Sequence, residues 1–184
     1  FLLLFFMPNI SVVMPCLNEE KTVARCVASA KKALENFPGR HEVIVVDNNS
    51  TDSSKKLAKK AGAIVVSEKK MGYGSAYLAG FKKAQGQIIV IADSDGTYDF
   101  TDIPKFVGLI REGNDFVIGS RFRGKMQSGS MRRLHKYFGN PILNAMFNAL
   151  FSTGLSDTHC GFRAFTKKSC EKMALHESSM EFVL

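Results

Sequence analysis

Two carboxylates, Asp93 and Asp95, directly follow an apolar, β-branched run at residues 87–92. A run of this length and composition predicts one buried strand. Carboxylates spaced in this way at a strand end can share Mg2+ or Mn2+, because these hard cations prefer oxygen ligands and often combine one or two carboxylates with substrate phosphates. The competing interpretation is a polar turn, in which Asp, Ser and Gly are common. The other strand ends have to decide between the two.

A second carboxylate, Asp47, ends another apolar run and opens the polar stretch 48–52. In that position it can accept hydrogen bonds from a ribose hydroxyl or a base. An Asx turn followed by a helix cap would explain the same residues, and both interpretations can hold at once.

Gly72 and Gly74 stand between the third predicted strand and the helix after it. They are a weak match to a dinucleotide-binding fingerprint. The third glycine of GxGxxG is missing, and the glycines follow the third predicted strand, whereas the fingerprint follows the first. We expect instead that these glycines let the backbone pass close to a ligand, or that they simply permit the turn.

Positive charge is concentrated in one stretch of the chain. The net charge of +8, from 25 basic and 17 acidic residues, suits anionic partners such as nucleotide phosphates, acidic lipid or nucleic acid. The basic side chains of the stretch are Arg121, Arg123, Lys125, Arg132, Arg133, His135 and Lys136. Arg121 follows a predicted strand end and is the better candidate for binding phosphate. A solvated basic loop explains Arg123 and Lys125 equally well.

Strand-like and helix-like segments alternate along the chain. The predicted strands are 10–14, 42–46, 63–66, 87–92 and 115–118, and the predicted helices are 19–36, 51–61, 72–84 and 102–111. This alternation predicts an α/β fold, a mostly parallel sheet with helices on both faces. Ligands of such sheets bind beyond the carboxyl ends of the strands. We therefore expect Pro15, Asp47, Asp93 and Arg121 on one rim.

Segment 140–150 predicts a further helix that is apolar almost all round. Packing against the core is the commoner reason for such a helix. Because the segment directly follows the basic stretch, it can also lie in a membrane interface.

Length and composition indicate one globular domain, since 184 residues with 45% apolar and 23% charged residues can bury a core. The four cysteines form no CxxC pair, which favours reduced thiols in a cytosolic setting over a zinc site. Residues 1–8 are an apolar leader, too short to span a bilayer, and are either a remnant of something longer or an apolar tail. Residues 9–184 are interpreted as a single catalytic domain truncated at its C-terminus.

Taken together, the polar strand ends resemble the successive signatures of family-two glycosyltransferases with the GT-A fold, a Rossmann-like architecture. These signatures are PCLNEE at 15–20, DNNSTD at 47–52 and Asp93-Ser94-Asp95. Within that family, DSDGTY at 93–98, GSRF at 119–122 and SDTHCGFR at 156–163 are similar to the polyprenyl-phosphate hexosyltransferases, which include dolichol-phosphate mannose and glucose synthases. The resemblance covers about residues 9–182.

The resemblance implies a nucleotide-sugar donor, GDP- or UDP-hexose, and Mg2+ or Mn2+ as cofactor. The residues expected to bind the nucleotide sugar are Pro15, Leu17, Asn18, Glu19, Asp47, Gly72, Asp93, Ser94, Asp95 and Arg121. Asp93 and Asp95 are the expected metal ligands. The residues expected to act in catalysis are Asp95, Asp157, Arg121 and Arg133, the two arginines as phosphate-binding groups and Asp157 as an acidic residue beside the transfer site.

The expected reaction is inverting transfer of a hexose to a polyprenyl phosphate, dolichyl or undecaprenyl, at the cytoplasmic face of a membrane. A lipid phosphate is already an anion at neutral pH and needs little help from a general base. One alternative is a family-two enzyme that acts on a sugar hydroxyl, with Asp157 as the candidate base. The other is a non-catalytic basic module, but no RNA-binding aromatic signature or helix-turn-helix pattern supports a nucleic-acid partner. The sugar and the base remain open.

Overall fold

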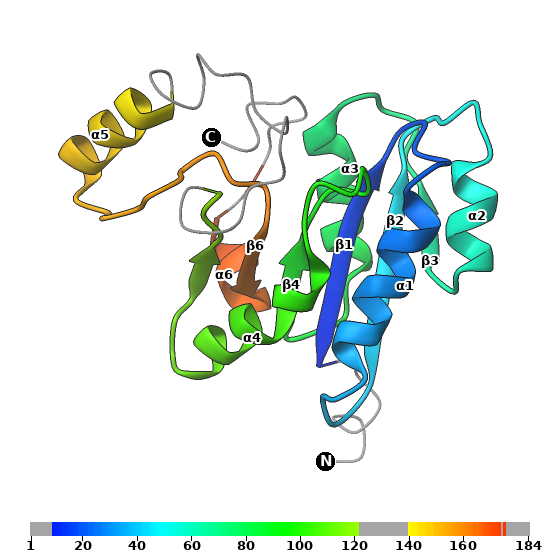
Figure 1. The fold of residues 1–184 in the computed structure, drawn as a ribbon, viewed down its shortest axis with the longest axis horizontal. Helices are drawn as coiled ribbons and strands as arrows, with labels where there is room; N and C mark the ends of the chain where they lie inside the picture. Colours follow the sequence, from blue (N-terminus) through cyan, green and yellow to red (C-terminus); the bar gives the residue numbers. More distant parts are fainter. Residues whose placement is uncertain (1–8, 122–139, 174, 176–184) are drawn as a thin grey trace.

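The computed structural model describes residues 9–121, 140–173 and 175, which fold around one sheet (Figure 1). The strands are β1 (Ile10–Cys16), β2 (His41–Asp47), β3 (Ile64–Ser67), β4 (Ile88–Ile91), β5 (Phe116–Ile118) and β6 (Arg163–Thr166). The helices are α1 (Val23–Leu34), α2 (Ser54–Lys60), α3 (Tyr73–Lys83), the 3-10 helix η2 (Phe100–Asp102), α4 (Ile103–Arg111), α5 (Asn140–Phe151) and α6 (Lys167–Lys172).

The strand order in the sheet is β3-β2-β1-β4-β6-β5. Strands β1 to β4 pair in parallel, whereas β6 runs antiparallel to both of its neighbours, β4 and β5. The prediction of a mostly parallel sheet is therefore confirmed. Strand β6 and helix α6 were not predicted, because a four-residue strand carries little periodic signal.

Two apolar layers hold the helices on the sheet. Val12 and Met14 of β1 face α1 and α4, whereas Val13 between them faces α3. This alternation follows from the two-residue period of a strand, and both faces are apolar because both are covered by helices. Each such side chain contributes about 1.5–3 kcal/mol when fully buried, so the sheet provides a firm frame for the loops at its edge.

Helix α1 begins at Val23, four residues later than predicted. The residues before the helix are bound through their backbone N–H groups by the neighbouring loop at residues 52–54. The N–H of Glu19 donates to Ser54 Oγ at 2.7 Å, and the N–H of Glu20 donates to Asp52 Oδ2 at 3.1 Å. Residues 19–22 therefore form a turn that joins the ends of β1 and β2.

Pro15 does not end β1, as the sequence predicted, but continues it to Cys16. The proline is tolerated because its ring nitrogen faces the side of β4, and β4 ends at the level of Val13. The carbonyl of Pro15 instead accepts a hydrogen bond from Ser94 Oγ at 2.6 Å. The other observed boundaries coincide with the predicted ones or differ from them by at most three residues.

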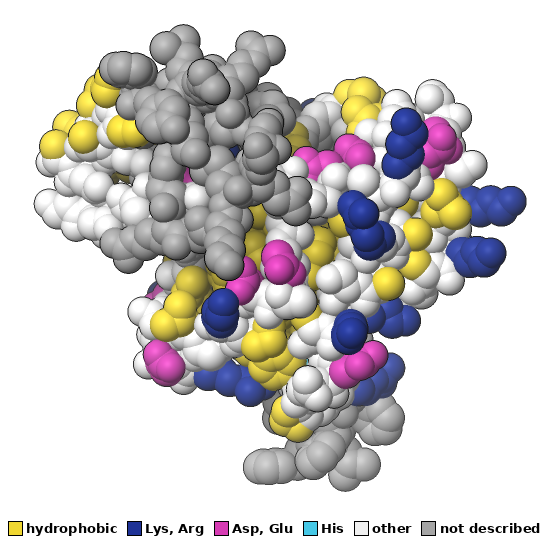
Figure 2. Space-filling view, in the orientation of Figure 1, with side chains coloured by type: hydrophobic (Ala, Val, Ile, Leu, Met, Phe, Trp, Pro, Cys, Tyr) yellow, Lys and Arg dark blue, Asp and Glu magenta, His cyan; other side chains and the backbone are white. Residues whose placement is uncertain are grey.

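Helix α5 buries a polar side chain and exposes several apolar ones, which is the opposite of an ordinary packed helix. Asn144 is buried with 7% exposed surface, whereas Ile142, Met146 and Leu150 are 56%, 55% and 72% exposed. Figure 2 shows hydrophobic side chains gathered over this helix. The predicted packing of an apolar helix against the core is therefore wrong for these side chains. Among the described residues, no helix is long and apolar enough to cross a membrane.

Candidate active site

A cavity of about 610 Å³ opens at the carboxyl ends of β1, β2 and β4. It is lined by Pro15, Cys16, Leu17, Glu19, Asn48, Met71, Gly72, Tyr73, Ala76, Asp93, Ser94 and Asp95. Strands β1 and β2 end together, because Cys16 lies beside Asp47, whereas β4 ends earlier, with Ile91 beside Val13. The segment after β4 then runs along the end of β1, where Ser94 binds the carbonyl of Pro15. A cleft beyond the carboxyl ends of parallel strands is the usual ligand site of this kind of sheet.

Two tyrosines of α3 hold Asp93 in place through their hydroxyl groups. Tyr73 donates its hydroxyl to Asp93 Oδ1 at 2.6 Å, and Tyr77, one helical turn later, lies at 3.5 Å from the same oxygen. Burial raises the pKa of Asp93 from 3.8 to about 6, against the lowering effect of the Tyr73 hydrogen bond. Burial likewise raises the pKa of Tyr73, so its hydroxyl stays protonated and acts as a donor. Oδ1 of Asp93 is thus fixed by Tyr73.

Asp95 lies two residues further on, exposed at the mouth of the cavity. Its side chain organises its own loop, since Thr97 donates its N–H to Oδ1 and its hydroxyl to Oδ2, both at 2.8 Å. Carboxylate oxygens retain lone pairs after one such bond. Asp93 and Asp95 fit a hard divalent cation that takes its remaining oxygens from a substrate diphosphate. Among the described residues no cluster of three or more His, Cys, Asp or Glu side chains could hold such a cation.

The loop before β6 passes very close to Asp93, and the glycine at position 161 makes this possible. A Cβ atom at Gly161 would lie 2.9 Å from the Tyr98 hydroxyl and 3.4 Å from Asp93 Oδ2. The N–H of Gly161 donates to that same Tyr98 hydroxyl at 2.9 Å. Gly161 and Tyr98 therefore bring the loop before β6 against the pair of carboxylates.

Asn48 fastens the loop that forms the opposite wall of the cavity. Its amide nitrogen donates to the carbonyls of Glu68 and Lys70, and its amide oxygen accepts the N–H of Gly72 at 2.9 Å. Gly72 has φ of +135°, a conformation in which a side chain would be strained. The glycine thus serves the turn and also lines the cavity, which agrees with both interpretations of its place in the sequence.

Asp47 is buried at the end of β2, and its Oδ1 accepts the N–H of Ser50 at 3.2 Å. This is the turn hydrogen bond that was one of the two interpretations of this residue. Asn18 has a similar local function, because its amide oxygen accepts the N–H of Thr51 at 2.8 Å. Neither side chain lines the cavity itself, and both shape the loops around it.

Arg121 and Asp157 form a bidentate ion pair at the other end of the rim. Asp157 Oδ2 accepts from Nε of Arg121 at 2.7 Å and from its backbone N–H at 3.0 Å, while Oδ1 accepts from Nη2 at 2.9 Å. The Asp157 side chain has no exposed surface, and that of Arg121 is 25% exposed. The hydrogen bond to Asp157 raises the pKa of Arg121, so the guanidinium is permanently charged.

The structure brings most of the predicted residues together. Those that line the cavity are Pro15, Leu17, Glu19, Gly72, Asp93, Ser94 and Asp95. Arg121 and Asp157 stand as a separate pair, and Arg133 lies outside the described residues together with the basic stretch around it. Tyr73, Tyr77, Tyr98 and Gly161 were missed. The signal for the two tyrosines of α3 was present, because they are four residues apart directly after Gly72.

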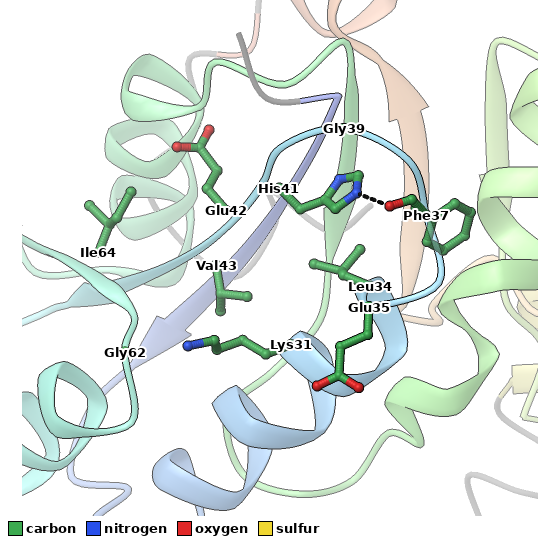
Figure 3. Close-up of a pocket in the computed structure, with 10 residues that line it drawn as sticks. All are labelled: Lys31, Leu34, Glu35, Phe37, Gly39, His41, Glu42, Val43, Gly62 and Ile64. Atoms are coloured by element: carbon green, nitrogen blue, oxygen red, sulfur yellow. Dashed lines mark hydrogen bonds between the residues drawn. The ribbon is translucent and has the colours of Figure 1, made fainter. Parts of the chain in front are cut away.

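A second hollow, of about 390 Å³, lies at the other end of the strands, opposite the first cavity (Figure 3). Lys31, Phe37 and His41 are among its lining residues, and the ring of His41 binds the carbonyl oxygen of Phe37 at 3.0 Å. None of the predicted site residues reaches it. The hollow adjoins the amino ends of β2 and β3, away from the ends at which ligands of parallel sheets bind.

The chain is similar to known proteins over most of its length. The family profile described as Glycosyl transferase family 2 matches residues 11–174. The chain is 42% identical over 176 residues to the low-salt glycan biosynthesis hexosyltransferase Agl6 of Haloferax volcanii. The matched region covers 95% of this chain and 42% of Agl6. It is 32% identical over 160 residues to the dolichyl-phosphate hexose transferase of the same organism, with 87% of this chain and 67% of that protein covered.

Among solved structures, the chain is similar to glucosyl-3-phosphoglycerate synthase from Mycobacterium tuberculosis in complex with Mn2+, UDP-glucose and phosphoglyceric acid. The TM-score is 0.67 at 26% identity, over 88% of this chain and 57% of the synthase. The chain therefore spans about half the length of most of these relatives. The sheet and this likeness confirm the predicted GT-A fold, and with the profile match over nearly the whole chain they show that the protein belongs to glycosyl transferase family 2.

Proposed function

We propose that this chain transfers a hexose from a GDP- or UDP-hexose to a polyprenyl phosphate, with inversion at the anomeric carbon, at the cytoplasmic face of a membrane. The observation that carries the choice of acceptor is the ion pair between Arg121 and Asp157. A sugar-hydroxyl acceptor would require a general base, and Asp157 was the candidate for that role.

Asp157 is poorly suited to remove a proton from an acceptor. Both of its oxygens already accept hydrogen bonds from Arg121, and its side chain is completely buried. A general base has to reach the proton it abstracts at hydrogen-bonding distance. A phosphate acceptor does not need that step, because its oxygen is already an anion. The site is therefore better matched to a phosphate than to a hydroxyl.

Arg121 keeps donors for such a phosphate. A guanidinium has five N–H groups, and the ion pair uses the edge formed by Nε and Nη2, which leaves Nη1 for a second anion. Because Asp157 fixes the orientation of the guanidinium, the remaining donors are preorganised at the rim. We assign Arg121 to the phosphate groups at the reaction centre, and Arg133 to the same function.

The cavity at the ends of β1, β2 and β4 is assigned to the nucleotide sugar. Pro15 and Glu19, which line the cavity, would contact the nucleoside together with Asp47 beside it at the end of β2, and Asp93 and Asp95 would hold Mg2+ or Mn2+ at the diphosphate. A metal bound there would supply positive charge to stabilise a departing nucleoside diphosphate. Support comes from the structural neighbours, which were solved with UDP together with Mg2+ or Mn2+.

Support for a lipid acceptor comes from two of the relatives. One is a dolichyl-phosphate hexose transferase, and another, 29% identical, is the undecaprenyl-phosphate 4-deoxy-4-formamido-L-arabinose transferase of Proteus mirabilis. The exposed apolar side chains of α5 suit an enzyme that meets its acceptor at a membrane surface.

An acceptor panel tests this function. The full chain is incubated with UDP-glucose, or in parallel with GDP-mannose, and Mg2+ or Mn2+. The acceptors are undecaprenyl phosphate, dolichyl phosphate, phosphoglyceric acid and a free disaccharide. We expect a product only with a polyprenyl phosphate. Transfer to the disaccharide or to phosphoglyceric acid, with none to either lipid, would instead establish a hydroxyl acceptor.

A further inference from the structure

We infer that Asn144 of α5 is a positioning residue for the Arg121–Asp157 pair, and that it acts by holding the backbone on both sides of Asp157. The inference rests on the proposed function, because it assigns a part in that same transfer reaction to a helix outside the donor cavity. It concerns a side chain that does not itself reach the substrate.

The contacts of Asn144 are all directed at one short segment. Its amide nitrogen donates to the carbonyl of Ser156 at 2.8 Å, and its amide oxygen accepts the N–H of Thr158 at 2.9 Å and the Thr158 hydroxyl at 2.7 Å. The side-chain amide of Asn144 thus hydrogen-bonds to both residues next to Asp157. All of these groups are buried or partly buried, where an unmade hydrogen bond is costly.

The choice of asparagine at this position has no explanation in helix formation. Asn is a poor helix former, and an apolar residue at a buried helix position would usually stabilise more. Helix α5 nevertheless turns Asn144 inwards and leaves Ile142 and Met146 exposed. Among the described residues, the two amide groups of Asn144 and Asn148 attach the helix to the rim of the site.

The link from Asn144 to the reaction runs through two steps. Asn144 fixes the backbone at residues 156 and 158, which places the buried carboxylate of Asp157. Asp157 in turn holds the guanidinium of Arg121 by two parallel bonds, at 2.7 and 2.9 Å. Arg121 is partly exposed and has many rotamers, so without this support its donors would spread over several positions. A misplacement of about 1 Å in a catalytic group can lower a rate 100-fold.

The chain contains a matched control one helical turn further on. Asn148 holds the same loop, since it donates to the carbonyl of Leu155 and accepts from the N–H of Leu155 and the hydroxyl of Thr153. It makes the same kinds of hydrogen bond from the same helix, but it does not bind the neighbours of Asp157. A general loss of loop structure should affect both asparagines alike.

The experiment compares Asn144→Ala, Asn148→Ala and Thr158→Val in the full chain, with kcat, both KM values and the thermal midpoint of unfolding measured for each. We expect Asn144→Ala to lower kcat about 10- to 100-fold while KM for the nucleotide sugar changes less than about 2-fold. Asn148→Ala should lower the thermal midpoint by a similar amount with kcat within about 3-fold of the unsubstituted chain. Thr158→Val keeps the backbone donor and should lower kcat by a smaller factor. If Asn144→Ala does not fold, the kcat of this milder variant still tests the inference.

A double-mutant cycle decides whether the effect passes through Arg121. In the background of Arg121→Lys, adding Asn144→Ala should lower kcat less than about 2-fold further, because the group that it positions is already gone. Equal losses of kcat for Asn144→Ala and Asn148→Ala, or fully multiplicative losses with Arg121→Lys, would overturn the inference. If the unsubstituted chain itself transfers no hexose to a polyprenyl phosphate, the proposed function fails first, and that outcome is seen before any variant is made.

Discussion

At the scale of single residues, the site carries a carboxylate whose burial is unfavourable for its charge. Asp93 is partly buried, and burial raises its pKa from 3.8 to about 6. The folded state therefore binds a proton more tightly than the unfolded state. The stability that this group contributes is greatest below pH 3.8, falls as the pH rises, and is lost above about pH 6. At neutral pH the folded protein holds an ionised Asp93 at a cost.

This cost leads to a prediction for Asp93→Asn. An amide has nearly the same shape, can accept the Tyr73 hydrogen bond and has no charge to desolvate. In the presence of a chelator at pH 7.5, we expect the variant to be more stable than the unsubstituted chain by about 1–2 kcal/mol, while transfer activity is abolished. Denaturant unfolding at pH 7.5 and at pH 4 provides the measurement. A variant that is less stable at pH 7.5, or equally stabilised at both pH values, contradicts this account of Asp93.

At the scale of elements, helix α5 combines two faces with different functions. Asn144 and Asn148 bind the loop that carries Asp157, whereas apolar side chains such as Ile142 and Met146 are exposed. Apolar side chains gathered on one exposed helix are a feature of surfaces that meet a partner or a membrane. The basic stretch that precedes α5 would add attraction for anionic lipid.

We therefore predict that the full chain sediments with vesicles that contain phosphatidylglycerol, and that the double variant Ile142→Ser, Met146→Ser binds at least about 10-fold more weakly. Leu109→Ser is the matched control, because Leu109 is a 43% exposed leucine on α4. The control should bind like the unsubstituted chain. If the double variant and the control bind equally well, α5 does not insert into the membrane.

At the scale of the whole molecule, the cavity at the carboxyl ends of β1, β2 and β4 is assembled from parts far apart in the sequence. Leu17 follows β1, Met71 precedes α3, and Asp95 follows β4, so each contributes one wall. The two carboxylates alone form a weak metal site, because hard cations of this kind require about six oxygen ligands. The missing ligands have to come from the substrate.

We predict that metal and nucleotide stabilise the protein only together. UDP or GDP with Mn2+ should raise the thermal midpoint by several degrees, whereas Mn2+ alone or nucleotide with a chelator should have little effect. The variant Asp95→Asn should lose this joint effect and keep its fold. A shift of equal size with Mn2+ alone would mean that the chain holds the metal without a diphosphate.

The fold class could be predicted from the sequence alone, and most of the residues predicted for the nucleotide-sugar site line one cavity. Alternating apolar strands and amphipathic helices identify a parallel sheet, and polar residues directly after strands, such as Asp93 and Asp95, must then lie on one rim. These inferences depend on local period and on one topological rule, so no tertiary information was needed. The start of α1 and the passage of Pro15 within β1 could not be inferred in the same way, because the loop at Ser54 and the end of β4 decide them.

The contacts of Asp157, Asn144 and Tyr73, in contrast, depend on the tertiary structure. Asp157 was expected beside the reaction, and its ion pair with Arg121, which joins residues 36 positions apart, could not be read from the sequence. The asparagines recur every four residues in α5, which is visible in the sequence, yet which face of the helix is buried depends on what packs beside it. Hydrogen bonds between distant segments are set by the global packing of the chain, and a local pattern does not contain that information.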